Sequence, residues 1–380
     1  MNNIVNQAEK TSYQAELFAN RLKKKYKELR KWARKNRVTC YRLYDRDIPE
    51  VPVSLDLYEF LPDEVDSVLE AARFMAAQNE KLSANDPTAD KEIKERSYAV
   101  LYLYERPYQK DDTEEAVWLE AMSGAAASVI GIPPSHIIKK SRGHKSHKND
   151  EQYQKIENTT EISGLVQEQG QLFRLDLTSY LDTGVFFDHR SLRNAVRETA
   201  GKKRVLNLFC YTGSFSVYAA QGNASYVESV DLSNTYLAWA KDNMKLNGFS
   251  DKKKYEFTRS DCLRFLQEKA VAAKGGKLTA EDLYDLIILD PPTFSNSKAT
   301  ADVLDINRDW PQLVKDCLNI LAPGGTFYFS TNSERIKFDI SKIPLKTAAG
   351  CEFEWKEITE ETIPPDFAGR RPHRVWKFVL

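Results

Sequence analysis

Hydrophobic positions in the second half of the chain follow two spacings that alternate. Short strand-like runs lie at 204–210, 226–233, 255–261, 284–292 and 326–332. Between several of these runs, apolar residues recur every three or four positions, which is typical of helices; these segments are 214–221, 235–248 and 307–325, the last with its Pro-Gly-Gly stop. Strands that alternate with helices need parallel crossover connections. The pattern therefore predicts an α/β fold with a doubly wound, mostly parallel sheet and helices on both faces.

The first half of the chain has a mixed pattern. Strand-like runs lie at 38–45, 51–60, 98–105, 136–141 and 172–178. A helix-like segment covers 114–131, and a charge-rich stretch at about 63–96 has the character of a helical insertion. We therefore expect two domains, a smaller α+β domain over residues 1–180 and the doubly wound domain over residues 181–380.

The composition is that of a folded, water-soluble protein. The 380 residues are 42% hydrophobic, and 55 basic side chains balance 55 acidic ones, so net charge indicates no partner. No apolar run approaches the roughly 20 residues that span a bilayer, and the N-terminal residues lack the pattern of a signal peptide, which predicts a cytoplasmic protein. The five cysteines are far apart and are expected to be reduced thiols that bind no metal.

Positive charge is concentrated in local clusters. Residues 21–37 carry ten basic side chains and one acid, whereas residues 135–149 carry five lysines or arginines, three histidines and no acid. A third cluster lies at 369–377. His144 and His147 have no further metal ligands beside them in the sequence, so we interpret them as part of the second cluster.

The first cluster has the spacing of an amphipathic helix. Leu22, Tyr26, Leu29 and Ala33 recur every three or four positions, which predicts one buried face and a basic outer surface. Two interpretations of this surface are open, a solvated helix and a contact with nucleic acid. Under the second interpretation, the predicted RNA-binding residues are Lys23, Lys24, Lys25, Lys27, Arg34, Lys139, Lys140, Arg142 and Lys145.

The first strand-to-helix turn of the second half, NLFCYTGSFS at 207–216, indicates a nucleoside cofactor. Dinucleotide-binding turns use several glycines to approach a pyrophosphate, whereas this turn has only Gly213. A turn of this kind suits a cofactor without phosphates, such as S-adenosylmethionine. Asp231, at the end of the next strand, can accept hydrogen bonds from both ribose hydroxyls, and Asp261, after the third strand, can accept one from the adenine amino group. Each aspartate can instead cap the helix that follows it.

A third carboxylate follows the fourth strand, in the stretch DLIILDPPTFSNSK at 285–298. Asp290 is expected beside the sulfonium of the cofactor, and Pro291 and Pro292 stiffen the loop that follows. The alternative is a turn with a capping aspartate. Because parallel strands end at one edge of the sheet, and three of them are followed by a carboxylate, we favour a cofactor site.

Several of these stretches resemble a known family. NLFCYTGSFSV, VDLSNTYLAWAKDNMKLNG and DLIILDPPTFSNSK are similar to class I S-adenosylmethionine-dependent RNA methyltransferases, whose catalytic domain is Rossmann-like. The closer resemblance is to the guanine-N7 (RlmK-type) half of bifunctional 23S ribosomal RNA methyltransferases, and it extends to residues 18–60 and to YLDTGVFFDHR at 180–190. It implies a 23S ribosomal RNA substrate in an unassembled or partly assembled large subunit. Family members are usually fused to a second methyltransferase, whereas the motifs of these 380 residues predict one catalytic domain.

The resemblance also implies site residues. In the family, the segment at 182–190 packs against the methionine end of the cofactor, so Asp188 and Arg190 are assigned there, and Arg190 can pair with the cofactor carboxylate. The candidate cofactor-binding residues are Thr183, Phe187, Asp188, Arg190, Asn207, Phe209, Tyr211, Thr212, Gly213, Ser214, Asp231, Leu232, Asp261, Cys262 and Asp290. The candidate catalytic residues are Asp290, Pro291, Pro292 and Phe294.

The residues near Asp290 narrow the choice of methyl acceptor. Methylation of cytosine C5 needs a cysteine thiolate, but the positions where such enzymes carry it hold Thr293 and the Ser-Thr-Asn sequence at 330–332. Guanine N7 has an unprotonated lone pair, needs no general base and leaves a cationic product that a fixed carboxylate stabilises. Phe294 can stack on the base or be a core aromatic. The alternatives are an exocyclic amine or another base atom of ribosomal RNA, and a non-catalytic S-adenosylmethionine-binding factor of ribosome assembly.

Overall fold

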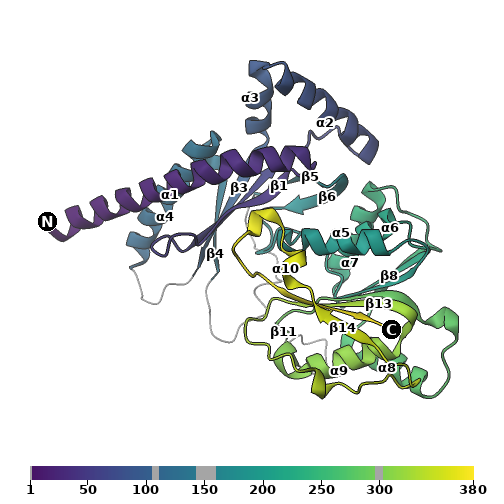
Figure 1. Cartoon of the computed structure of the whole chain (residues 1–380). Helices are drawn as coiled ribbons and strands as arrows, with labels where there is room; N and C mark the ends of the chain where they lie inside the picture. The colour runs from purple at the N-terminus through teal and green to yellow at the C-terminus, as the bar shows by residue number, and fades with distance from the viewer. Residues whose placement is uncertain (1, 105–110, 143–159, 296–302) are drawn as a thin grey trace. The chain divides into compact units, whose positions relative to one another are not determined.

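The computed structural model describes residues 2–104, 111–142, 160–295 and 303–380 (Figure 1). The chain divides into two compact units, Met1–Thr183 and Gly184–Leu380. The sequence places the boundary close by, between residues 180 and 181. None of the helices in the described ranges combines the length and the apolar character needed to cross a membrane.

The first unit is an α+β structure built on a four-stranded sheet. Its strands, in spatial order, are β1 (Cys40–Asp45), β2 (Val53–Glu59), β3 (Ser97–Tyr104) and β4 (Ile137–Arg142). Strand β2 is antiparallel to β1 and β3, whereas β4 is parallel to β3. A parallel neighbour needs a crossover connection, which helix α4 (Asp112–Ile130) provides. A separate hairpin of β5 (Ser163–Glu168) and β6 (Gln171–Asp176) follows.

The core of this unit lies between its sheet and two long helices. In α1 (Asn2–Lys35), Leu22, Leu29 and Ala33 are buried, and they share one apolar core with Trp118 of α4 and with residues of β1 to β3. The predicted buried face of the basic helix is thereby confirmed. The helical repeat places these positions on one side, and the lysines between them point elsewhere.

The charge-rich stretch at 63–96 forms two helices, α2 (Val68–Ser83) and α3 (Pro87–Glu95). Asp86 separates them, because its side chain accepts a hydrogen bond from the first turn of α3 and so caps that helix. Arg30 of α1 forms an ion pair with Asp90 of α3. This pair attaches the insertion to the long helix of the same unit.

The second unit contains a seven-stranded sheet in the order β14–β15–β13–β10–β7–β8–β9. These strands are β7 (Arg204–Leu208), β8 (Tyr226–Asp231), β9 (Tyr255–Arg259), β10 (Tyr284–Leu289), β13 (Leu321–Thr331), β14 (Glu354–Glu357) and β15 (Arg374–Val379). Strands β13 to β9 in this order are parallel, and β15 is antiparallel to both of its neighbours. The predicted doubly wound, mostly parallel sheet is confirmed.

Helices cover both faces of this sheet (Figure 1). The helices of the unit are α5 (Arg190–Thr199), α6 (Ser214–Gln221), α7 (Asn234–Leu246), α8 (Cys262–Lys274), α9 (Ile306–Asn319) and the short α10 (Thr359–Thr362). Successive side chains of a strand point to opposite faces, so Val205 packs with α5 and α6, whereas Leu206 and Leu208 pack with α8 and α9. A short hairpin of β11 (Phe294–Ser295) and β12 (Leu304–Asp305) precedes α9.

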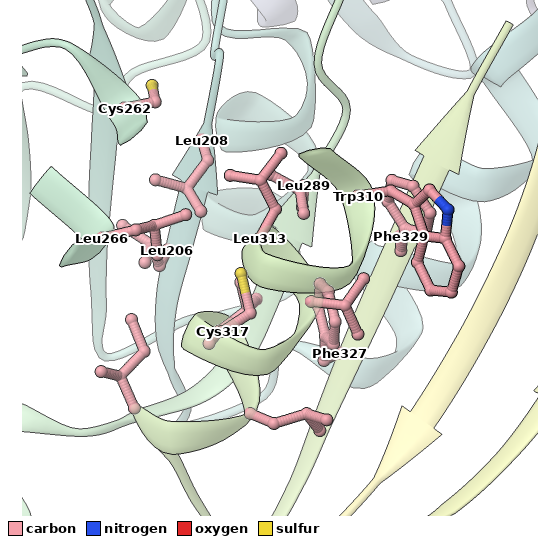
Figure 2. Packing of buried hydrophobic residues seen from close by; sticks show 14 of the residues in the cluster. Leu206, Leu208, Cys262, Leu266, Leu289, Trp310, Leu313, Cys317, Phe327 and Phe329 are labelled. Carbon is pink, nitrogen blue, oxygen red and sulfur yellow. The ribbon is translucent and has the colours of Figure 1, made fainter. Parts of the chain in front are cut away.

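The core beneath α8 and α9 is the larger of these two (Figure 2). Figure 2 shows Leu313 and Cys317 of α9 directed at the strands that carry Leu206 and Leu289. Burial raises the pKa of the Cys317 thiol well above its usual value, so this cysteine is a neutral packing residue. The rigid sheet formed in this way fixes where each parallel strand ends.

The sequence pattern misses the last two strands of the sheet. Strand β15 starts within the third basic cluster, whose charges obscure the apolar alternation of its residues. Arg371 and Arg374 of this cluster both form ion pairs with Glu357 in β14. The cluster therefore contributes to the joining of two antiparallel strands.

Candidate cofactor-binding and active site

The strand ends predicted to carry the site lie at one edge of the parallel sheet. Strands β7 and β10 are neighbours, but the chain continues from β7 toward β8 and β9 and from β10 toward β13. Doubly wound sheets bind ligands at such a reversal, beyond the carboxyl ends of the strands. The loops after β7, β8 and β10 are therefore the walls of the candidate site.

The loop after β7 is sharply turned. Phe209, Tyr211 and Gly213 have φ angles of 54°, 49° and 76°, values that non-glycine residues adopt rarely. The backbone N–H of Tyr211 donates to Oδ2 of Asp231 at 3.0 Å, and that of Phe209 donates to Sγ of Cys262 at 3.2 Å. These two bonds hold the turn against the end of β8 and the start of α8.

Gly213 has a packing role in this turn. A Cβ atom at this position would lie 2.8 Å from Cβ of Ala240 in α7. The neighbouring Thr212 is fully buried; its hydroxyl donates to the carbonyl of Gly184, and its carbonyl accepts from Nδ2 of Asn243 at 2.9 Å. The sequence suggests that Gly213 lets the backbone approach a cofactor closely. In the structure, this glycine instead lets the turn lie close to helix α7.

Gly213→Ala is expected to lower the free energy of unfolding by about 2–5 kcal/mol, because a left-handed conformation costs an alanine roughly 1–2 kcal/mol and overpacking adds about 1–3 kcal/mol. Gly248→Ala is the matched control, since its φ is 82° and no atom lies within 4 Å of the added Cβ. Urea unfolding of both variants measures the difference. Equal losses would contradict the packing role of Gly213.

Asp231 presents its carboxylate at the end of β8. Oδ2 accepts from Tyr211, and Oδ1 accepts from the N–H of Ser233 at 2.9 Å. The side chain that caps α7 is Ser233, so the alternative that Asp231 caps this helix is wrong. Burial raises the pKa of Asp231, and nearby backbone N–H groups partly oppose that rise. Each carboxylate oxygen can accept two hydrogen bonds, which leaves this group capacity for a ligand.

Asp261 and Cys262 serve the fold at the start of α8. Asp261 caps the helix by accepting from the N–H of Leu263 at 3.0 Å, as the alternative interpretation expects. The thiol of Cys262 is buried, accepts from Phe209 and lies 3.6 Å from the carbonyl of Val230. With its side chain used in this way, Cys262 can contribute to a cofactor site only through its backbone.

Asp290 lies directly beyond β10 and contacts a buried histidine. Its Oδ1 is 3.3 Å from Nε2 of His189, and that same nitrogen is 2.8 Å from Oγ of Ser330 at the end of β13. On the other side of the ring, Nδ1 of His189 lies 3.4 Å from Oδ2 of Asp188. The imidazole therefore lies between two carboxylates.

The charges in this cluster are mutually stabilised. Burial opposes protonation of His189, but Asp290 and Asp188 overcome it and raise the pKa of the imidazole to about 10. Burial likewise opposes ionisation of Asp290, yet the charge of His189 and hydrogen bonds from His189 and Ser330 lower its pKa. The pKa of Asp188 falls well below its usual value for the same reason, the contacts with His189 and His373 outweighing burial. The contacts between His189, Asp188 and Asp290 thus favour the charged form of each of these three groups.

The sequence reasoning misses three members of this cluster, His189, Ser330 and His373. The only local signal is the position of His189 inside the VFFDHR segment, next to Asp188 and Arg190. Ser330 ends a predicted strand, which places it at the correct edge of the sheet. His373 lies in a basic cluster near the C-terminus, and nothing in that cluster indicates a buried position.

Arg190 has an internal partner. Its Nη1 donates to Oδ1 of Asp366 at 2.7 Å, and both side chains are at most 1% exposed. The guanidinium also lies 5.6 Å from the ring of Phe187, which is buried. We therefore correct the expected pairing of Arg190 with the cofactor carboxylate: in this structure the residue forms a buried ion pair that anchors the start of α5.

Other candidates also have internal contacts. Asn207 is buried in β7 and donates from Nδ2 to Oγ of Ser216 at 2.9 Å. Thr183 belongs to the first unit, where its hydroxyl lies 3.0 Å from that of Tyr58. Ser214 is the first residue of α6 and Leu232 directly follows β8. These last two lie at the predicted edge of the sheet, and their contact with a cofactor remains a prediction.

The loop after Asp290 exposes an aromatic side chain. Pro291 is buried and Pro292 half-buried, whereas Phe294 in β11 is 40% exposed. The alternative that Phe294 is a core aromatic is therefore wrong. The hydroxyl of Thr293 donates to Oδ1 of Asn332 at 2.6 Å, which joins this loop to the end of β13.

The predicted RNA-binding residues of α1 differ in exposure. Lys23, Lys24 and Lys27 are exposed, and Lys25 is half-buried. Arg34 is half-buried with its Nη2 fully covered, and its charge opposes the rise that burial causes in the pKa of Glu59. Arg34 is thus directed partly at the interior, and the three exposed lysines form the basic surface of this helix.

The second basic cluster is only partly described. Lys140 is buried, and its ammonium donates to the carbonyls of Tyr180 and Leu181, so it is a structural cation and we withdraw it from the RNA surface. Lys139 is exposed and pairs with Glu120. Arg142 is the last residue of β4. Lys145, His144 and His147 lie outside the described residues.

Known proteins similar to this chain share its architecture. The family model of S-adenosylmethionine-dependent methyltransferases matches residues 124–374. A curated relative from Magnetococcus marinus, ribosomal RNA large subunit methyltransferase K/L, is 37% identical over 96% of this chain, which spans only 43% of that protein. Ribosomal RNA large subunit methyltransferase K of Neisseria meningitidis is 36% identical, over 95% of this chain and 86% of its own length. The crystal structure of SMU.776 in complex with SAH has a TM-score of 0.65, with 20% identity over 96% of this chain and 82% of that one.

Proposed function

Because the chain belongs to the family of S-adenosylmethionine-dependent methyltransferases, we propose that it transfers the cofactor's methyl group to N7 of a guanine in 23S ribosomal RNA. Relatives that match nearly the whole chain act, by name, on ribosomal RNA of the large subunit. The observation that carries the choice of acceptor is the loop at Asp290, which combines an ionised carboxylate with the exposed ring of Phe294.

The residues at the sheet edge fit the proposed cofactor. Asp231 offers carboxylate oxygens to the ribose hydroxyls, and the turn from Tyr211 to Gly213 approaches the same strand end. Asp261, although it caps α8, lies at the next strand end and can also accept from the adenine amino group. Several glycines, which a pyrophosphate would require, are absent from this turn.

The proposed reaction needs no proton acceptor. With cofactor bound, the N7 lone pair forms a bond to the methyl carbon while the carbon–sulfur bond breaks and its electron pair remains on sulfur. Asp290 faces the positive charge that appears on the base and stabilises it electrostatically. Phe294 stacks on the purine, a contact worth about 1–3 kcal/mol per base. Since the base must reach this edge, the guanine is unpaired or flipped out of its helix.

Single-turnover methylation of purified, unmodified 23S ribosomal RNA tests the proposal. Nucleoside mass analysis of the product is expected to detect 7-methylguanosine. A methyl group on an exocyclic amine or on another base atom would overturn the choice of N7 and retain the enzyme class. Cofactor binding without transfer would instead favour a ribosome-assembly factor.

We also propose that the exposed lysines of α1 contact the phosphate backbone of the RNA. Replacing Lys23, Lys24 and Lys27 together with glutamate is expected to lower RNA affinity at least about tenfold. It should also reduce the slope of log affinity against log salt by about 2–3, since each lost phosphate contact removes roughly 0.7–0.9. Filter binding or fluorescence anisotropy between low and moderate salt measures both quantities.

The chain offers a control with the same change in charge. Lys252, Lys253 and Lys254 are exposed and precede β9, so they lie at the opposite end of the parallel strands from the site. Reversing these three charges should alter the salt slope by less than about 1. If both triple variants lose affinity equally, the effect is one of overall charge and α1 is scaffold.

A further inference from the structure

His189 is a buried imidazole for which the proposed reaction has no direct use. The side chain is 6% exposed, and its two ring nitrogens face the carboxylates of Asp188 and Asp290 at 3.4 and 3.3 Å. The hydroxyl of Ser330 approaches Nε2 at 2.8 Å. The imidazole is therefore in direct contact with the carboxylate on which the proposed reaction depends.

A second histidine fixes the first. The ring of His373 stacks on that of His189, with centroids 4.5 Å apart and planes 25° from parallel. Nδ1 of His373 lies 3.1 Å from Oδ2 of Asp188, and its Nε2 lies 3.0 Å from the hydroxyl of Thr362. Phe215 makes a T-shaped contact with the same ring, with centroids 5.9 Å apart. The stacked ring of His373 and the contacts of Nε2 with Ser330 and Asp290 hold the imidazole, whereas Nδ1, 3.4 Å from Asp188, makes no hydrogen bond within the described residues.

The cluster connects elements that are distant in the sequence. Asp188 and His189 precede α5, Asp290 follows β10, Ser330 lies in β13, and His373 precedes β15. All belong to the second unit. Asp290, which contacts His189, also begins the loop that leads to Phe294, so a change in any member alters the support of the proposed reaction centre.

We propose that His189 is a positioning residue, which holds the carboxylate of Asp290 ionised and in one orientation toward the methyl acceptor, and that His373 and Asp188 hold His189 in turn. This inference rests on the proposed role of Asp290. It also bears on which base atom accepts the methyl group. A protonated imidazole has no lone pair that could receive a proton. This suits a methyl acceptor that releases no proton during the reaction, such as a ring nitrogen.

The contribution of these charges to folding stability depends on pH, in opposite directions for the histidine and for the two carboxylates. Folding raises the pKa of His189 from 6.5 to about 10, so the stabilisation from its charge is complete below about pH 6.5 and lost as pH rises through about 10. Folding lowers the pKa of Asp290 and Asp188, and their stabilisation is lost as pH falls through the lowered values. The charged groups facing His189 are these two carboxylates, and the ring of His373 stacks on it.

His189→Gln tests the inference, because glutamine keeps a hydrogen-bond donor and removes the charge. The single-turnover rate is expected to fall on the order of 10- to 100-fold, as for a displaced reacting group, while calorimetry finds S-adenosylmethionine affinity changed by less than about threefold. The acidic limb of the pH–rate profile should move to higher pH, since Asp290 loses the cation that lowers its pKa. An unmoved limb would overturn the inference.

His136→Gln is the matched control. His136 belongs to the first unit, where its Nδ1 bonds to the carbonyl of Ser97 and its ring stacks on Tyr98. This variant is expected to keep the wild-type acidic limb. His373→Gln is expected to move the limb in the same direction as His189→Gln but less far, since it acts only through the ring that it supports.

Two measurements on the wild-type protein keep the inference open to refutation if both variants fail to fold. In nitrogen-15 spectra of the five histidines, one ring is expected to remain doubly protonated at pH 8; titration of every ring near 6.5 would overturn the inference.

The second measurement concerns a bound metal ion. Ligand-type atoms of Asp188, His189 and His373 lie within 4.8 Å of one another. Loss of activity after dialysis against a chelator, with recovery on adding zinc, would replace the charge cluster by a metal site.

Failure of the proposed function is a separate outcome. If the wild-type enzyme methylates a base atom other than N7, the N7 proposal fails, and the shift of the acidic limb still decides the role of His189. If the wild type forms 7-methylguanosine and His189→Gln matches it at every pH, only the positioning role fails.

Discussion

Replacing Asp290 with asparagine is expected to lower the rate of methyl transfer by about 10²- to 10³-fold, the loss typical of removing one preorganised electrostatic contact. Asparagine has nearly the same shape but lacks the negative charge that faces the methylated base. It also removes one of the two carboxylates that keep His189 protonated. Affinity for S-adenosylmethionine should change by less than about threefold, because the ribose contacts lie at a different strand end.

A control for Asp290→Asn exists on the same strand. Asp285 lies at the opposite end of β10, where its Oδ2 accepts from the backbone N–H of Arg204 at 2.8 Å. Asp285→Asn should cost stability and leave the rate of transfer within about threefold of wild type. Single-turnover rates and calorimetric affinities for both variants test the role. Equal loss of binding and transfer in Asp290→Asn would contradict it.

Replacing Asp231 with alanine is expected to weaken S-adenosylmethionine binding by about 100-fold or more, because two hydrogen bonds to a charged acceptor contribute roughly 1.5–3 kcal/mol each. The same change frees the N–H groups of Tyr211 and Ser233. The turn after β7 then loses the bond that holds its left-handed residues. Both effects act on binding, so the rate at saturating cofactor should fall much less than the affinity.

Asp242→Ala is the control for Asp231→Ala. Asp242 is exposed on α7, the helix that follows β8, and its loss removes the same charge from the same region of the chain. Calorimetric titration with S-adenosylmethionine is expected to give the wild-type dissociation constant for this variant. A matching loss of affinity in both variants would indicate a general effect of charge. An unchanged affinity in Asp231→Ala would remove Asp231 from the site.

The position of the candidate site could be predicted from local patterns. Asp231 and Asp290 each follow a short apolar run, and parallel strands bring such positions to one edge. The exposure of Phe294 could not be predicted, because a single aromatic residue after two prolines suits both a core and a surface loop. Asp261 shows a further limit, since a helix cap and a ligand contact require the same residue type at the same position.

Charge clusters were the least reliable guide to function. Ten basic residues in one segment predict a cationic surface, but Arg34 is half-buried with its Nη2 covered and Arg30 pairs with Asp90. Lys140 is buried against two carbonyl groups. The number of charges in a segment is known from the sequence, whereas the packing of neighbouring elements decides which of these side chains reach solvent.

By itself, the sequence determined the alternation of the parallel strands with several of their helices and the strand ends at which carboxylates lie, although it missed β14 and β15. These features follow from repeats of about two and 3.6 residues, which act within one element. Only the tertiary structure decided the pairs that link distant elements: His189 with Ser330, His373 with Asp188, and Arg190 with Asp366. Such pairs depend on the order of strands in the sheet, and above all on β15 entering antiparallel between β13 and β14, which no local repeat encodes.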